Sequence, residues 1–183
     1  MRRLETAGSI AEAFRTMLGT LGGCLSWDAA ELWVPDKSRD GGCGVEPPLT
    51  RSACWCRHGN NPCVLDEGGD GSGVPARVWR TRKPVWITYA GLEPGLCPRI
   101  QQARDLGLES ACAVPVSVRN VRMVGVLLLL ARDPHPPDID LLECVSSLGR
   151  ALAEWTCLDS AGGWGERLSA VQRALARCRC ALG

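Results

Sequence analysis

Residues 73–118 decide the fold of this chain through two informative runs, GVPARVWRTRKPVWI (73–87) and PRIQQARDLGLESACAVPV (98–116). Pro75 and Pro98 each predict the start of a short helix, because the missing proline N–H has no partner to lose in a first helical turn. Gly107 ends the second helix, since glycine accepts the left-handed conformation that closes many helices. Strands are predicted at 85–87 and 109–118. The stretch therefore predicts a helix, a strand, a second helix and a second strand.

The sequence before this stretch predicts one amphipathic helix and two strands. Ser9 and Glu12 form a capping box, and apolar residues then recur at helical spacing as far as residues 22–23. Residues 49–58 predict the second strand, between loops at 36–48 and 59–73. Residues 28–35 alternate with period two, as a half-buried strand does. The residues of its two faces are Ala30, Leu32 and Val34 on one side, and Ala29, Glu31 and Trp33 on the other.

The sequence after residue 118 predicts the centre of a sheet. Residues 121–132 are almost continuously apolar, as expected of a central strand that is covered on both faces. Residues 119–120 predict the turn of an antiparallel hairpin. Helices and strands in this order indicate an α+β fold, an α/β sandwich built on a central antiparallel sheet.

Two apolar stripes follow the last strand. A long helix is predicted from residue 136, and a second amphipathic helix is predicted within 160–183. The stripes have the spacing that buries one helix against another, either within the chain or in a second copy. Their residues are Leu141, Val145, Leu148, Leu152 and Trp155, then Leu168, Val171, Leu175 and Cys178. We therefore expect a domain at 1–159 and a dimerisation or signalling helix at 160–183.

The motifs of residues 73–118 resemble those of GAF domains, a family of small-molecule sensor modules. The resemblance covers about residues 18–158 and is strongest after residue 73. It implies a central antiparallel sheet with the first and last helices on one face, and with short helices over a ligand pocket on the other. The matching residues are Gly73, Val74, Pro75, Arg77, Val78, Trp79, Pro84, Trp86, Ile87, Pro98, Arg99, Gly107, Leu108, Val114, Pro115 and Val116.

Composition restricts the partners and the compartment. The net charge of this chain of 183 residues is +1, which gives no long-range field to select a nucleic acid or an anionic membrane. The longest apolar run, 123–131, is too short to span a bilayer. The cysteines number eleven, an odd count, and no signal peptide precedes them. We expect free thiols in the cytoplasm or another reducing compartment, with no nucleic-acid or membrane partner.

The resemblance also suggests ligand-binding residues. Cationic side chains crowd residues 77–83, where GAF proteins present positive charge to anionic ligands. Arg77 and Arg99 are the candidates at family-like positions, and the alternative for such a cluster is a solvated helix face. The remaining candidates are large or polarisable side chains for which core packing is the alternative role: Trp33, Trp55, Trp79, Trp86 and Cys112.

A second kind of site is indicated by thiols in the second strand. Period-two alternation places Cys54, Cys56 and His58 on one strand face, and Cys63 in the adjoining loop supplies a fourth donor. Thiolates and imidazole suit zinc or an iron–sulfur cluster. The spacing is not an established metal motif, so free or redox-active thiols are the alternative.

Two chemistries of the GAF fold lack their key residue here. Photoreceptors of this fold attach a bilin through a cysteine that a histidine usually follows, whereas Pro98 follows Cys97. Reductases of free methionine sulfoxide resemble this chain in the turn at residues 73–76, but Pro75 occupies the position of their nucleophilic cysteine. Bilin attachment and reductase activity are therefore disfavoured.

The resemblance and the missing motifs together predict a non-catalytic domain. We expect a sensory or regulatory domain in which a ligand or a redox event shifts the short helices and the terminal helices relay the change. A homodimer is predicted through those terminal helices. The alternatives are a metal-dependent redox sensor, a structural dimerisation module without a ligand, and the reductase-like enzyme.

Overall fold

The computed structural model describes residues 15, 17–20, 22–23, 25–36, 47–57, 73–89, 100–118, 122–157, 173 and 176. In that part of the chain one sheet has the strand order β2-β1-β5-β4-β3, and each neighbouring pair is antiparallel. The strands are β1 (Ala29–Pro35), β2 (Leu49–Cys56), β3 (Val85–Thr88), β4 (Ser110–Val118) and β5 (Arg122–Ala131). The predicted central antiparallel sheet is confirmed.

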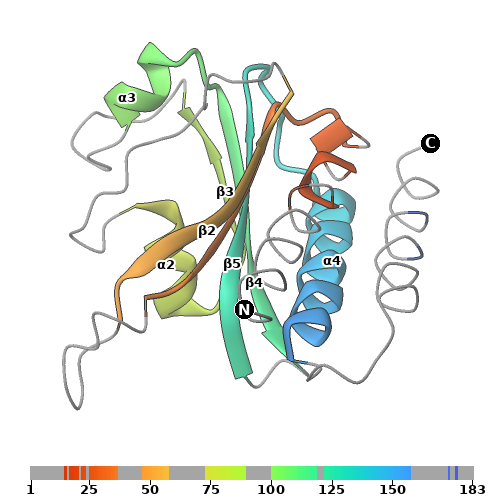
Figure 1. Cartoon of the computed structure of the whole chain (residues 1–183). Helices are drawn as coiled ribbons and strands as arrows, with labels where there is room; N and C mark the ends of the chain where they lie inside the picture. The colour runs from red at the N-terminus through yellow and green to blue at the C-terminus, as the bar shows by residue number, and fades with distance from the viewer. Residues whose placement is uncertain are drawn as a thin grey trace, which may run out of the picture.

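Helices cover both faces of this sheet. Figure 1 shows α2 (Val74–Thr81) and α3 (Ile100–Asp105) on one side, and α4 (Ile139–Cys157) on the other. The helical residues 15, 17–20 and 22–23, here called the N-terminal segment, lie on the same side as α4 (Figure 1). We name the two sides the α2 face and the α4 face. The α+β arrangement, with terminal helices opposite the short helices, matches the prediction.

Alternation along the strands divides the core between the two faces. On the α4 face, Leu32 of β1 and Leu127 of β5 pack with Val145 and Leu148 of α4. On the α2 face, Trp33 of β1 packs in one cluster with Val78 of α2 and with neighbouring strand residues. Both faces are apolar, so burial of this surface from water provides the main driving force for the fold.

The N-terminal segment lies close to the sheet because two of its residues are glycines. A Cβ atom at Gly19 would lie 2.8 Å from Nε1 of Trp55, and a Cβ at Gly22 would overlap the same indole ring. Trp55 lies on β2, so this contact joins the first helix of the domain to an edge strand.

Several helix ends follow directly from the sequence. Gly107 has φ +68 after α3, as its predicted left-handed cap requires. Helix α4 begins at Ile139, slightly later than the predicted start at residue 136, because Asp138 caps it. Oδ1 of Asp138 accepts a hydrogen bond from the backbone N–H of Leu141 at 3.0 Å, and thereby satisfies one otherwise unpaired donor of the first turn.

Some predictions fall on residues that are not described. They include the start of the first helix, residues 37–46 of the loop at 36–48, residues 59–72 of the loop at 59–73, the turn at 119–120 and, apart from positions 173 and 176, the helix within 160–183. None of the described helices is both long enough and apolar enough to cross a membrane.

Candidate functional site

A charged side chain is buried on the α2 face of β1. Glu31 is 1% exposed, and its Oε2 accepts a hydrogen bond from the Trp33 indole N–H at 2.9 Å. Its Oε1 lies 3.4 Å from a guanidinium nitrogen of Arg51, which is 19% exposed. A buried carboxylate is costly unless it is paired and hydrogen-bonded, and these partners provide both. We call these three residues the Glu31 cluster.

Two thiols lie beside the Glu31 cluster. In the register of β1 and β2, Cys54 is opposite Glu31 and Cys56 is opposite Ala29. Residues directly opposite in an antiparallel pair project to the same face, so both thiols belong to the α2 face. Cys54 and Cys56 are half-buried, and neither forms a disulfide. The predicted shared face of these two cysteines is therefore present.

The metal prediction extends beyond the described residues. His58 and Cys63, the other two proposed ligands, lie outside them. Within the described ranges, no group of three or more His, Cys, Asp or Glu side chains is arranged to hold a metal ion. Cys54 and Cys56 by themselves provide two thiolate donors, which is fewer than a structural zinc site needs.

The sheet separates the predicted ligand-binding residues. Trp33 and Trp79 pack on the α2 face. Trp55, Trp86 and Cys112 pack on the α4 face, because strand side chains alternate between the two sides. The four candidate tryptophans are thus divided between the two faces, so a ligand on the α2 face is within reach of two of them, and their role in ligand binding stays a prediction.

One of the two predicted cationic residues, Arg77, projects away from the sheet. Arg77 is exposed on α2, whereas Val74, Pro75 and Val78 form the buried side of that helix. Arg99 lies outside the described residues. On the α2 face of the sheet, the structure pairs the cation of Arg51 with a buried carboxylate, in the Glu31 cluster.

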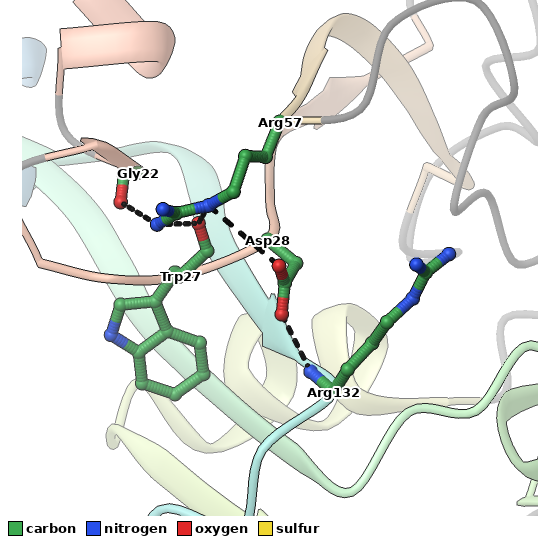
Figure 2. Close-up of polar contacts among 5 residues, drawn as sticks. All are labelled: Gly22, Trp27, Asp28, Arg57 and Arg132. Atoms are coloured by element: carbon green, nitrogen blue, oxygen red, sulfur yellow. Dashed lines mark hydrogen bonds and ion pairs between the residues drawn. The ribbon is translucent and has the colours of Figure 1, made fainter.

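An arginine connects β2 to the N-terminal segment. Figure 2 shows the Arg57 guanidinium between the backbone oxygens of Gly22 and Trp27, to which its Nη2 donates hydrogen bonds of 3.3 and 3.1 Å. Its Nε lies 3.7 Å from Oδ1 of Asp28. The other oxygen of Asp28 accepts a hydrogen bond of 2.8 Å from the backbone N–H of Arg132, just after β5 (Figure 2). Arg57 therefore links the end of β2 to the end of the first helix.

A second polar junction connects β3 and β4 to the segment before α4. The His135 carbonyl accepts a hydrogen bond of 3.0 Å from the Trp86 indole, and its backbone N–H donates to Oγ of Ser110 at 2.7 Å. The His135 ring stacks on Trp27 with the ring centroids 4.9 Å apart. Within the described structure, Nε1 of Trp27 and Nε2 of His135 are buried without a hydrogen-bond partner. This junction joins β3, an edge strand of the sheet, and β4 to the segment just before α4.

The thiol of Cys112 is protonated and unreactive at neutral pH. It lies fully buried in the core of the α4 face, and this burial raises the pKa of its thiol from 9.0 to about 12. Because the thiolate is the reactive form of cysteine, Cys112 is unsuited to act as a nucleophile or a metal ligand. Packing is the role that this environment supports.

Sequence reasoning missed Glu31, Arg51, Arg57 and His135. The signal for Glu31 was available, since it occupies the same strand face as Ala29 and Trp33 in an otherwise apolar run. Arg51, Arg57 and His135 gave no such signal. Their partners are 20 to 35 residues away in the chain or, for His135, 25 and 49 residues away.

Solved structures share this fold at low sequence identity. The GAF domain region of a Geobacter sulfurreducens PCA protein superposes with a TM-score of 0.67 at 12% identity, and the match covers 85% of this chain and 98% of that one. NreA of Staphylococcus aureus, mutated in its nitrate binding site, has a TM-score of 0.55 at 24% identity, with coverage of 70% and 91%. The second GAF domain of DevS from Mycobacterium smegmatis has a TM-score of 0.51 at 15% identity, with coverage of 89% and 96%.

Comparison at the sequence level gives the family. None of the curated proteins compared with this chain matches it. The family model described as the GAF domain matches residues 7–154, which is most of the chain. GAF domains are generally sensory or regulatory, and the sheet with short helices on one face and terminal helices on the other agrees with that match. The chain belongs to the GAF domain family.

Proposed function

We propose that this domain is a non-catalytic sensor that binds a small ligand on the α2 face and relays binding through its terminal helices. The observation that carries the proposal is the Glu31 cluster, a buried carboxylate held by an indole and a guanidinium on an otherwise apolar sheet face. Buried charges at such positions are candidates for function, because apolar packing alone does not require them. A ligand that replaces Trp33 or Arg51 as a hydrogen-bonding partner of Glu31 gives the α2 face two states, one without and one with the ligand.

The polar contacts of Arg57 and those of His135 connect the sheet to the terminal helices. Arg57 contacts the backbone oxygen of Gly22, at the end of the N-terminal segment, and that of Trp27. It directly follows β2, which carries Arg51, Cys54 and Cys56. His135 contacts β3 and β4 just before α4 begins. A displacement of β2 or β3 by a ligand therefore reaches both terminal elements through direct contacts, as relay by a population shift requires.

Oxidation of thiols on the same face is a second candidate signal. Cys54 is directly opposite Glu31, so a change of charge or size at this sulfur alters the environment of the cluster. A metal held by Cys54 and Cys56 with donors from beyond the described residues belongs to this second candidate. Measurement of zinc and iron in protein purified without added metal separates it from simple thiol oxidation.

A thermal-shift screen tests the first candidate. The panel contains nitrate, because NreA has a nitrate binding site, together with phosphate, carboxylates, amines and nucleotides. A ligand at about a hundred times its Kd stabilises the folded state by about 2.7 kcal/mol, which raises Tm by roughly 5 to 10 °C in a domain of this size. We expect at least one compound to produce such a shift.

Two arginine variants locate the binding site. Arg51→Gln removes the cation of the Glu31 cluster and should abolish the shift, whereas Arg122→Gln removes an exposed cation at the start of β5 and should preserve it. A panel without any shift would favour the structural module. A shift that both variants retain would place the ligand away from the Glu31 cluster.

A further inference from the structure

Four cations are concentrated at the end of α2 and in the turn after it. Arg77, Arg80, Arg82 and Lys83 are all exposed, and we call them the α2 basic cluster. The buried side of the helix consists of Val74, Pro75 and Val78, so the cations project away from the sheet. Among the described residues, none of the four forms an ion pair.

The charge of the α2 basic cluster is not balanced locally. Residues 73–89 contain four cations and no acidic residue. The rest of the chain therefore has 17 Lys and Arg against 20 Asp and Glu, a net charge of −3. Although the net charge of the whole chain is small, residues 73–89, which contain α2 and β3, are positive and the rest of the chain is negative.

Helix stability accounts for only part of this charge. Arg80 lies in the last turn, where a cation interacts favourably with the helix dipole, and its Nε donates to the Ala76 carbonyl at 3.4 Å. The backbone N–H of Arg82 already caps the helix through the Val78 carbonyl. Additional cations beyond the last turn repel one another and satisfy no further carbonyl in the described structure.

We propose that the α2 basic cluster is a docking site for an acidic segment of a partner polypeptide. Three of the four cations are arginines, whose planar guanidinium groups bind carboxylates through two parallel hydrogen bonds. The cluster spans seven residues, which matches a short run of Asp and Glu side chains. Exposed charges are screened beyond about 8 Å at physiological salt, so binding depends on this local charge and not on the net charge of the domain.

Extended polyanions fit the site less well. A duplex nucleic acid or a bilayer reaches far beyond seven residues and meets other parts of the chain, which outside residues 73–89 has a net charge of −3. Membrane attachment also benefits from apolar side chains beside the cations. Among the described residues the only large exposed hydrophobic side chain is Ile139, which begins α4 on the opposite face of the sheet.

Binding of an acidic peptide tests this proposal. The probe is a fluorescent peptide of about eight residues rich in Asp and Glu, measured by anisotropy at about 50 mM salt, and the control peptide carries Asn and Gln instead. We expect saturable binding of the acidic peptide alone. The double variant Arg80→Glu with Lys83→Glu should weaken it at least about tenfold, because two attractive contacts become repulsive.

Matched variants distinguish the cluster from general electrostatics. Arg122→Glu with Arg150→Glu makes the same charge change at exposed positions of β5 and α4, and should alter the affinity less than about twofold. If the first double variant does not fold, Arg80→Gln with Lys83→Gln replaces it, with an expected loss of at least about threefold. Equal losses from both sites, no acidic-peptide binding, or tighter binding of a DNA duplex or of phosphatidylserine vesicles would overturn the proposal. The proposal does not depend on the ligand site of the α2 face, which the thermal-shift screen tests separately.

Discussion

At the scale of single residues, Glu31 places a buried charge on the otherwise apolar α2 face. Its carboxylate is buried, yet each oxygen accepts a hydrogen bond, one from Trp33 and one from Arg51. Such a group stabilises the fold only while both partners remain, since removing one leaves a buried polar atom unpaired. It also fixes the orientation of the Trp33 indole, because that N–H has a defined acceptor.

Glu31→Gln should destabilise the domain by about 1–3 kcal/mol. The amide has only one oxygen, so its NH₂ group must face one of the two donors, and Arg51 loses its counterion. Urea unfolding followed by tryptophan emission measures the change. Glu143→Gln, the same substitution at an exposed position of α4, is the control and should stay within about 0.5 kcal/mol of the parent. Equal effects of the two changes would refute the assigned role of Glu31.

At the scale of elements, α4 packs so closely on β4 that one position tolerates no side chain. A Cβ atom at Gly149 would lie 2.7 Å from the carbonyl oxygen of Pro115 and 3.4 Å from Cγ2 of Val114. The nearest contact is between backbone atoms of both elements, so a Cβ atom at Gly149 fits only if the helix moves away from the strand. The same helix inserts Leu141, Val145 and Leu148 into the core of the chain. The described part of the predicted dimerisation stripe is therefore buried within the chain, and the terminal-helix homodimer stays a prediction.

Gly149→Ala should destabilise the domain by about 1–2 kcal/mol, even though alanine favours helix by about 1 kcal/mol over glycine. The steric cost exceeds the gain in helix propensity because the clash is with backbone. Gly23→Ala provides the control, since a Cβ there meets nothing within 4 Å, and it should be neutral or stabilising. Thermal or urea unfolding of both variants decides the matter; a more stable Gly149→Ala protein would show that α4 adjusts freely.

At the scale of the whole molecule, stability at alkaline pH depends on the buried thiol. The pKa of Cys112 is about 12 in the folded state, against 9.0 when the thiol is exposed to water. The folded state therefore keeps a proton that the unfolded chain releases above about pH 9. This thiol contributes stability that is complete below that pH and is lost between about pH 9 and about pH 12.

The unfolding free energy of the parent should fall more steeply over that range than that of Cys112→Ala, with a difference approaching about 4 kcal/mol by pH 12. The alanine variant has a lower baseline because it leaves a small cavity, so the comparison uses the slopes and not the absolute values. Urea unfolding at several pH values measures both slopes. Parallel curves would show that the thiol titrates equally in the folded and unfolded states.

The sequence by itself determined the element order, the antiparallel sheet and which side chains share a strand face. Helix caps such as Gly107 and the alternation of β1 are local, because backbone conformation and side-chain direction follow from neighbouring residues. Only the tertiary structure decided which residues meet. Glu31 with Arg51, Arg57 with Gly22, and Trp86 with His135 are contacts between distant positions, set by strand register and by which face each element covers. For the same reason the tryptophans of one expected site lie on opposite sides of the sheet.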